Sequence, residues 1–415
     1  MARRPAATVI GGGIAGLASA ASLARHGWQV TVLERAPAFG EVGAGLAVTR
    51  NGMAALDALG AGEAVRAAGY RVRTAGFKDC HGRWLLRLPY VAPERDATSW
   101  LCAVHRQRLH AALLDAACDA ELVGGAEVVW VEPGEPEGRP ATVAWRTPAG
   151  ERTCDSDLVV AADGIRSTVR SQLFPRAHLE YTGATSWRAV AVTRNVVDDR
   201  FVAFWGPGSE FGALRVSDTE VYWYGYFRHP VGARFADELD AARDRFAGWP
   251  ARVTGIVAAT TADQLIRHDV YHLPAGLPAH VRGRVVMVGD AAHAAAPTMG
   301  QGAASAVEDG VCVGHLVAAP VTAGGALATA LTGFDRARRP RCRQITRQSA
   351  LMDRYGAGVP GGWRQSVRNA LVRLVPSGLV VKAGGAVVRW RPPADAAPYP
   401  GDHESSLSFS YENVS

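Results

Sequence analysis

Lysine is almost absent from this 415-residue chain, in which only Lys78 and Lys382 occur, so arginine supplies nearly all of the positive charge. The net charge of +6 is modest, and no basic patch is interleaved with aromatic residues, which argues against a nucleic-acid-binding protein. The six cysteines are scattered, without a Cys-x-x-Cys pair or a cluster of histidine and cysteine at metal-ligand spacing. We therefore expect no bound metal, and reduced thiols in a cytoplasmic protein.

Long uninterrupted apolar runs are also missing. Residues 311–331 carry no formal charge over 21 positions, but His315, Pro320, Gly324 and Gly325 interrupt them. We expect a buried helix followed by a turn there, and no transmembrane segment. Near the N-terminus, Arg3-Arg4 and an alanine-rich stretch are similar to the start of an export signal. Glycines interrupt that stretch as well, and it ends in Arg25-His26-Gly27, which favours a protein that stays in the cytoplasm.

A glycine motif, Gly11-x-Gly13-x-x-Gly16, joins a short apolar strand at residues 7–10 to a helix that we expect to end near His26. In this motif the first glycine allows a tight turn, the second lets the backbone approach a pyrophosphate, and the third permits close packing of helix on strand. The pyrophosphate then meets unpaired N–H groups and the positive end of the helix dipole. The strand and helix on either side of the motif indicate a dinucleotide-binding fold.

The second strand of this fold, at residues 29–33, ends at Glu34, 18 residues beyond Gly16. An acid at this place accepts hydrogen bonds from the ribose hydroxyls of an adenine dinucleotide, and it disfavours a 2′-phosphate. We assign Glu34 and its neighbour Arg35 to the cofactor site.

A second glycine segment lies late in the chain. An apolar strand at residues 285–288 ends in Gly289-Asp290, and a glycine-bracketed turn from Pro297 to Gly302 then leads into a helix of small residues. Either segment alone would fit several folds. Together they narrow a generic dinucleotide fold to one flavin-enzyme architecture.

Three further segments between them suit a ligand site. Residues 41–47 are bracketed by glycine and are typical of a loop that lies against a flat ligand. Arg106 begins an apolar-periodic helix, where it could pair with a phosphate or carboxylate, although a solvated surface arginine is an equal alternative. Asp163-Gly164 follows a strand at residues 157–161, at the place where open α/β sheets bind ligands. An ordinary helix-capping aspartate is the alternative there.

The residue pattern of the chain changes between residues 181 and 272, where strand-like segments rich in aromatic residues occur. Alternation along residues 221–227 places Tyr222, Tyr224 and Tyr226 on one face of a strand, and Trp223 and Phe227 on the other. We expect an inserted sheet that forms a second layer and encloses a pocket, although such aromatic residues more often belong to a core.

These segments predict an α/β protein. We expect a Rossmann-like dinucleotide-binding domain of the GR2 type in two parts, residues 1–180 and 276–335, interrupted by a mixed β-sheet substrate domain at 181–275. A C-terminal helical segment follows at 336–391, and residues 392–415 have the composition of a flexible tail.

With its three glycine-containing segments in this order, the chain resembles the single-component, class A flavoprotein monooxygenases of the para-hydroxybenzoate hydroxylase type over roughly residues 5–375. Salicylate hydroxylase-like and biosynthetic members are the most similar. The resemblance implies a non-covalently bound FAD, with NADH or NADPH as a transient electron donor, since no second Gly-x-Gly-x-x-Gly motif joins an apolar strand to a helix. It also implies hydroxylation or epoxidation of an electron-rich aromatic ring or alkene through a C4a-hydroperoxyflavin.

The resemblance further implies roles for individual residues. Asp290 would bind the ribityl chain, and Pro297 would lie beside the oxygen-reacting face of the flavin. Arg188 and Tyr224 are the best matches to the catalytic arginine and tyrosine of the inserted sheet, with Tyr222 and Tyr226 as close rivals. The expected cofactor-binding residues are Gly11, Gly13, Gly16, Glu34, Arg35, Ala47, Arg106, Asp163, Asp290, Gly300, Gln301, Gly302 and Ala303.

Three competing functions share this fold or its cofactor. A flavin-dependent halogenase would use a lysine, for which Lys78 is the candidate, but its Trp-x-Trp-x-Ile-Pro segment is missing. A flavin reductase or dehydrogenase without oxygenation would also fit the glycine segments, and so would a non-catalytic flavin-binding scaffold. The expected partners are a small-molecule substrate and O₂, in a monomer or homodimer, and the arginine-flanked apolar stretch at residues 370–391 would allow peripheral membrane contact.

Overall fold

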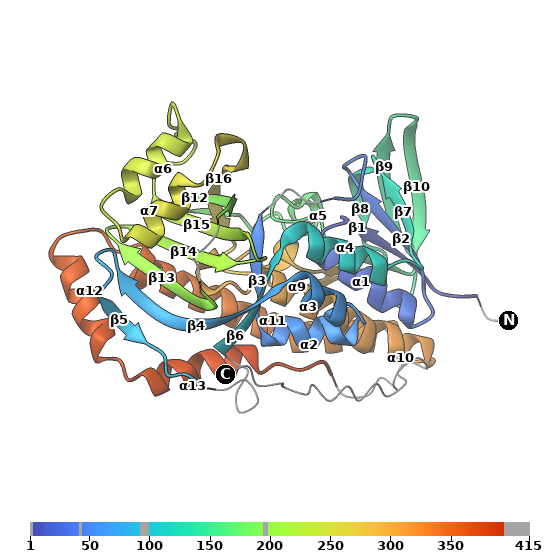
Figure 1. Ribbon diagram of the computed structural model, residues 1–415. Coiled ribbons are helices and arrows are strands. Elements are labelled where there is room, and N and C mark those ends of the chain that lie inside the picture. The colour runs from blue at the N-terminus through green and yellow to red at the C-terminus, as the bar shows by residue number, and fades with distance from the viewer. Residues whose placement is uncertain (1–2, 41–43, 92–98, 194–197, 394–415) are drawn as a thin grey trace.

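The computed structural model describes residues 3–40, 44–91, 99–193 and 198–393. Two α/β layers lie side by side, and the C-terminal helices run beneath both of them (Figure 1). The tail expected at residues 392–415 falls almost entirely outside the described residues, as do the first three residues of the loop expected at 41–47.

The first layer is a six-stranded sheet in the order β17-β18-β11-β1-β2-β7, parallel except for the β17–β18 pair. The core of this layer joins the sheet to α1 (Ile14–Arg25), α4 (Arg106–Ala116) and α9 (Gly302–Val313) through apolar residues of all three helices. Its strands are β1 (Ala6–Ile10), β2 (Gln29–Glu34), β7 (Glu121–Gly124), β11 (Leu158–Ala161), β17 (Val281–Arg282) and β18 (Val285–Met287).

A three-stranded antiparallel sheet covers the opposite face of the first layer. Val131, Val143 and Trp145 of this small sheet share one core with Val159 and Val285 of the six-stranded sheet. The small sheet consists of β8 (Glu127–Glu132), β9 (Ala141–Thr147) and β10 (Gly150–Ser156).

The second layer is a nine-stranded sheet in which strands from two distant parts of the chain combine. β12 to β16 lie in the range expected for the substrate domain, but β3 to β6 come from before residue 106, within the range expected for the first dinucleotide-binding part. The strands are β3 (Gly45–Val48), β4 (Tyr70–Asp79), β5 (Trp84–Arg87), β6 (Trp100–His105), β12 (Glu180–Val192), β13 (Arg200–Gly206), β14 (Ser209–Arg215), β15 (Glu220–Arg228) and β16 (Ile266–His272).

One expectation about this region is wrong. Residues 45–48 form β3 and not part of a loop, because they pair in register with β6. Gly45 is needed there, since a Cβ at this position would lie 2.3 Å from the Cβ of Tyr222 on β15.

The two faces of β15 are used as the alternation predicts. Trp223 and Phe227 are buried with residues of α6 (Glu238–Phe246) and α7 (Ala251–Ala258), which cover one face of the sheet. Tyr222, Tyr224 and Tyr226 belong to two small clusters on the other face. That second face is the one available to a ligand site.

The chain ends in helices that cross from the first layer to the second. After α9, a π-helical turn at Gly314–Ala318 and α10 (Ala319–Thr322) lead into α11 (Leu327–Met352), in agreement with the expected helix and turn at residues 311–331. A second π-helical turn, η5 (Asp353–Ala357), precedes α12 (Trp363–Leu374) and α13 (Ser377–Val388). Of the helices described, none is long and apolar enough on its own to cross a membrane; α12 and α13 reach that threshold only as a pair, bent by 88°.

Candidate active site

The first glycine motif forms the turn between β1 and α1. A Cβ on Gly16 would lie 1.8 Å from the carbonyl oxygen of Gly11, and a Cβ on Gly11, whose φ is +102°, would lie 2.4 Å from the carbonyl oxygen of Ala162. No described side chain caps the helix, which follows Gly13. The N–H groups of its first turn therefore remain available to a phosphate.

Glu34 holds this turn from the neighbouring strand. Its Oε2 accepts a hydrogen bond of 2.7 Å from the backbone N–H of Gly12, and its Oε1 accepts one of 2.8 Å from the N–H of Ala36. A carboxylate has further lone pairs, so Glu34 can still accept from a ribose. The buried His110 of α4 lies 2.8 Å through Nε2 from the carbonyl oxygen of Gly12. Arg35 is exposed beside Glu34.

Asp163 lies just beyond the carboxyl end of β11. Its Oδ2 accepts from the backbone N–H of Val169 at 3.1 Å, whereas its buried Oδ1 has no hydrogen-bond partner among the described residues. Burial raises the pKa of this carboxyl group. Ser167 is the N-cap residue of the following helix, α5 (Thr168–Leu173), and Asp163 also accepts from the first turn of this helix, but through Oδ2 alone. An unpartnered buried acceptor fits a donor supplied by a cofactor.

The buried side chain of Arg170 joins the Asp163 segment to the Asp290 turn. Its Nη1 donates to the carbonyl oxygens of Asp290 and Ala291, both at 3.3 Å. Asp290 is the first residue of α8 (Asp290–His293), and its own side chain is exposed. Gly289 before it has a φ of +58°, and a Cβ there would lie 2.7 Å from the Cβ of Ala15. The turn is therefore shaped by close contact with α1.

The structure thus brings four predicted segments to one edge of the first sheet. The glycine turn, Glu34, Asp163 and Asp290 follow the carboxyl ends of β1, β2, β11 and β18, which are parallel neighbours. This edge is the place where open α/β sheets bind ligands.

The turn before α9 carries the other predicted cofactor residues. Gly300 is left-handed, with a φ of +61°, and α9 begins at Gly302 and Ala303 without a side-chain cap. Two hydrogen bonds hold the side chain of Gln301. Asn51 Nδ2, on α2 (Arg50–Ala58), donates to Gln301 Oε1 at 3.0 Å, and Gln301 Nε2 donates at 3.2 Å to Oγ1 of Thr49, the residue before α2. The free helix N–H groups can therefore face a ring system in a fixed orientation.

A buried charged network supports both turns from behind. Asp309 on α9 accepts from the backbone N–H of Gly289 at 2.8 Å and from Arg338 Nε on α11 at 2.6 Å. Arg338 also donates from Nη1 to Glu308 at 2.7 Å, and Asn51 Nδ2 donates to the other Glu308 oxygen at 2.7 Å. Glu308, Asp309 and Arg338 are fully buried.

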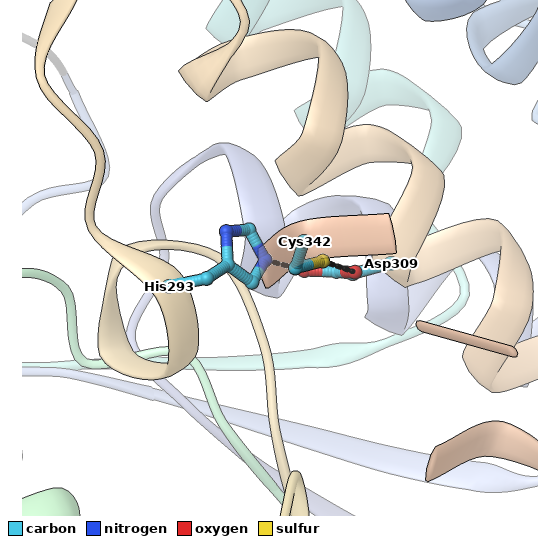
Figure 2. Close-up of side chains that lie close together, drawn as sticks. All are labelled: His293, Asp309 and Cys342. Atoms are coloured by element: carbon cyan, nitrogen blue, oxygen red, sulfur yellow. Dashed lines mark hydrogen bonds and ion pairs between the residues drawn. The ribbon is translucent and has the colours of Figure 1, made fainter. Parts of the chain in front are cut away.

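Figure 2 shows His293, Asp309 and Cys342 with their side chains directed toward one another. Their possible ligand atoms lie within 4.8 Å of one another, and His293 Nε2 is 2.5 Å from Asp309 Oδ2. A cation does not fit here, because the guanidinium of Arg338 already contacts the other oxygen of Asp309. Burial alone would lower the pKa of His293, but the neighbouring Cys342 and Asp309 raise it well above its usual value. We interpret the cluster as an ion pair.

The second sheet supplies the predicted catalytic pair. Arg188 on β12 and Tyr224 on β15 are register partners, whereas Pro297 lies on a different element, in the turn before α9. Tyr224 donates from its hydroxyl to Glu210 Oε1 at 2.5 Å, and Trp205 Nε1 donates to Glu210 Oε2 at 2.8 Å. Burial raises the pKa of Glu210, which is only 3% exposed.

Contacts also separate Tyr224 from its two rivals. Tyr226 donates to Asp353 Oδ1 at 2.8 Å, away from Glu210. Tyr222 is buried against Gly45, and burial raises its pKa although the charges of Arg188 and Arg106 oppose this rise. Tyr224 is the tyrosine of the three that is not fully buried.

The charges of Arg106 in the first layer and Arg188 in the second act on a common group. Arg106 begins α4, and its backbone N–H donates to the carbonyl oxygen of Ala44 at 2.8 Å, beside the half-buried Ala47 of β3. His268 on β16 is accessible to solvent, but its desolvating surroundings and the charges of Arg188 and Arg106 lower its pKa to about 4. An arginine of each layer therefore acts on the same histidine.

Comparisons with known proteins agree with this architecture. The family model described as FAD binding domain matches residues 4–349. Aurachin C monooxygenase/isomerase from Stigmatella aurantiaca is 33% identical over 377 residues, covering 89% of this chain and 94% of that protein. The 2-heptyl-3-hydroxy-4(1H)-quinolone synthase of Pseudomonas aeruginosa is 32% identical over 375 residues, covering 88% and 93%.

A solved structure shows the same fold. HpxO from Klebsiella pneumoniae, complexed with FAD and uric acid, matches with a TM-score of 0.79 and 25% sequence identity over 92% of this chain and 96% of that one. The resemblance found from the ordered glycine segments is thereby confirmed. The chain belongs to the FAD binding domain family and, within it, to the class A FAD-dependent monooxygenases.

Proposed function

We propose that the protein uses NADH or NADPH and O₂ to oxygenate an electron-rich ring that carries an ionisable O–H or N–H group. The observation that carries this proposal is the hydrogen bond between Tyr224 and the buried Glu210, beside Arg188, on the sheet face that is not covered by α6 and α7. A 4-quinolone is the first substrate to test, because one relative of similar length is named as a quinolone synthase. We place the reaction in the cytoplasm, which the free cysteines among the described residues support.

The described residues fit FAD. The turn at Gly11 to Gly16 has no room for a Cβ and offers free N–H groups, and Asp163 Oδ1 is a buried acceptor that needs a donor. We assign the pyrophosphate to this turn, the ribose to Glu34 and the ribityl hydroxyls to Asp290. The ring system would meet the N–H groups of Gly302 and Ala303, with Arg106 contributed by the start of α4. When bound, FAD accepts a hydride from the nicotinamide donor and activates O₂.

Tyr224 and Glu210 can remove a proton from the substrate. Tyr224 already donates its own proton to Glu210, so its oxygen is free to accept a hydrogen bond from a substrate O–H or N–H group. The substrate proton then passes to Tyr224 as the Tyr224 proton passes to Glu210, which leaves an electron-rich anion beside the guanidinium of Arg188. Charge stabilisation by the half-buried Arg188, with water kept out by the aromatic face, favours attack by the ring carbon.

The proposal is tested by incubating the FAD-loaded protein with NADH or NADPH, ¹⁸O₂ and a panel of 4-quinolones, phenols and indoles. One labelled oxygen in the product, detected by mass spectrometry, supports it. Reduction or desaturation of a substrate without label would show a reductase or dehydrogenase instead. Failure of every substrate to accelerate NAD(P)H oxidation would favour a flavin-binding scaffold.

Replacing Tyr224 by phenylalanine should leave FAD binding intact and uncouple NAD(P)H oxidation from product formation. Without the hydroxyl the substrate keeps its proton, and we expect product formed per NAD(P)H to fall by about 100-fold, the usual contribution of a positioned acid or base. Product and peroxide are measured together. Tyr226→Phe is the matched control, because Tyr226 lies on the same face but donates to Asp353; equal uncoupling in both variants would remove the special role of Tyr224.

Replacing Glu210 by glutamine should change the pH profile. Glu210 must be ionised to receive a proton, so kcat/KM of the wild type should fall as the pH is lowered through the pKa of Glu210, which burial places above its usual 4.5. In the Glu210→Gln variant the amide would keep the hydrogen bond to Tyr224 but could not accept a proton, so the acid limb should disappear and the plateau should drop by about 10- to 100-fold. An unchanged acid limb would assign that limb to another group.

A further inference from the structure

Helix α12 exposes large apolar residues to solvent, whereas two of its polar residues are buried against the protein. Trp363, Leu371 and Leu374 are 72%, 60% and 78% exposed, whereas Arg368 and Asn369 are buried. Together with the exposed Val367, these residues lie along one face of the helix. We call Trp363, Val367, Leu371 and Leu374 the apolar stripe. An ordinary surface helix has the opposite arrangement.

This inverted orientation is fixed by hydrogen bonds. Arg368 Nη1 donates to the carbonyl oxygen of Gly356 at 2.5 Å, and its Nε donates to Asn369 Oδ1 at 2.8 Å. The guanidinium of Arg368 also lies 5.2 Å from the centre of the Trp205 ring. Rotation of α12 to bury the apolar stripe would break the contacts of Arg368 with Gly356 and with Trp205, so the stripe remains on the outside.

The segments on either side of the apolar stripe are also rich in exposed apolar and basic residues. Exposed apolar side chains flank α12 on both sides along the chain. Residues 354–393 include no acidic residue and seven basic residues, all of them exposed except Arg368. A patch that combines exposed apolar side chains with one sign of charge is typical of an interaction surface. The flanking apolar residues are Leu351, Tyr355, Val375 and Leu379, and the basic residues are Arg354, Arg364, Arg368, Arg373, Lys382, Arg389 and Arg391.

We propose that the apolar stripe docks the protein onto an anionic bilayer surface, with α12 lying in the plane of the headgroups. Trp363 and the leucines would enter the boundary between headgroups and acyl chains, and the arginines would contact anionic headgroups. α12 has 12 residues, too few to cross the hydrocarbon core, and the 88° bend before α13 turns the chain away from a span.

The positive charge favours a bilayer over a second copy of this chain. A symmetric dimer brings the same patch of both subunits together, so a contact through the stripe would place two sets of basic residues against each other. An anionic membrane offers the complementary charge and an apolar interior at once.

The test is co-sedimentation of the full-length, FAD-loaded protein with vesicles of phosphatidylcholine alone or of equimolar phosphatidylcholine and phosphatidylglycerol. We expect binding to the anionic vesicles that weakens as salt is added. Leu371→Glu/Leu374→Glu should lower the partition coefficient by about tenfold or more, because it removes buried apolar area and adds repelling charge. Leu122→Glu/Trp130→Glu is the matched control, since both residues are exposed and lie on β7 and β8, at the other side of the molecule from α12 (Figure 1).

A second variant, Arg364→Glu/Lys382→Glu, leaves the stripe intact and should abolish the preference for anionic vesicles. Retained flavin absorbance and an unchanged melting temperature show that each variant is folded. The proposal is overturned if the wild type does not sediment with anionic vesicles, or if Leu371→Glu/Leu374→Glu binds as the wild type does. A wild-type dimer in light scattering that this variant converts to a monomer, without any vesicle binding, would assign the stripe to self-association instead.

Discussion

Replacing Asp290 by alanine should yield a folded protein that purifies without most of its FAD. The Asp290 side chain is exposed at the start of α8, at the carboxyl edge where Glu34 and Asp163 also lie, and Gly289 and Arg170 fix its backbone. A hydrogen bond to a charged group contributes about 1.5–3 kcal/mol, so each bond lost to a ribityl hydroxyl should raise the FAD dissociation constant by about 10- to 100-fold. Fluorescence titration of the apoprotein with FAD measures this change.

Asp240→Ala is the matched control for this experiment. Asp240 is likewise an exposed aspartate in the first turn of a helix, α6, and its side chain pairs with Arg243 on the surface. Both variants lose a favourable charge at a helix N-terminus, but only Asp290→Ala should lose FAD. Asp290→Asn keeps one acceptor oxygen and should fall between the wild type and the alanine variant. An Asp290→Ala protein that purifies yellow at full occupancy would contradict the assignment of the ribityl site.

Much of the first layer could be predicted from the sequence, because its constraints are local. Gly11, Gly16 and Gly289 occupy positions where a Cβ would collide with a carbonyl oxygen or a neighbouring side chain, and each directly follows, or lies close to, an apolar strand. The parallel order of the strands then places Asp163 and Asp290 at one edge. The order of these segments also led to the family, which the match over residues 4–349 confirms.

The arrangement of the second sheet could not be predicted in this way, because it depends on the register between strands, which no local sequence pattern reveals. Alternation puts three tyrosines of β15 on one face, but only the pairing of Gly212 on β14 with Tyr224 shows which of them reaches Glu210. A Cβ on Gly212 would lie 2.4 Å from the Tyr224 ring, so the glycine lets that ring lie across β14. One sequence feature points to Glu210, which is an acidic residue next to the apolar run from Phe211 to Leu214. The sequence does not show that its partner is Tyr224.

For a similar reason, the sequence does not predict the residues that contact the cofactor-binding turns from distant parts of the chain. His110 contacts Gly12 across 98 positions of the chain, and Arg170 contacts Asp290 across 120. Neither residue belongs to a motif, since its role depends on where its helix packs. The strands β3 to β6 were likewise missed, because their partners in the sheet lie on both sides of the expected domain boundary.

Replacing Arg338 by methionine should destabilise the protein more than any other substitution considered for α11. Arg338 is fully buried and donates to Glu308, to Asp309 and to the carbonyl oxygen of Ser305. Removing one partner of a buried ion pair typically costs about 3–5 kcal/mol. We expect the lower part of this range, because Glu308 keeps Arg341 and Asp309 keeps His293 as a charged partner. The melting temperature of the apoprotein should therefore fall, and FAD should bind more weakly, because Asp309 also positions the N–H of Gly289.

Arg339→Met provides the control on the neighbouring residue. Arg339 is 30% exposed and pairs with Asp335 one helical turn away, and a surface pair of this kind contributes only about 0–1 kcal/mol. A melting temperature lowered equally by both substitutions would mean that the buried network has no special part in stability.

The pH dependence of the Arg338→Met variant gives a sharper test of the same network. Without Arg338, the carboxylate of Asp309 depends on the protonated ring of His293 as its charged partner. A histidine whose pKa is raised in the folded state adds stability below its usual value of 6.5, and this stability is lost as the pH rises through the folded value. The deficit of the variant relative to the wild type should therefore widen as the pH is raised above neutrality. A deficit that stays constant with pH would show that His293 does not compensate for the lost arginine.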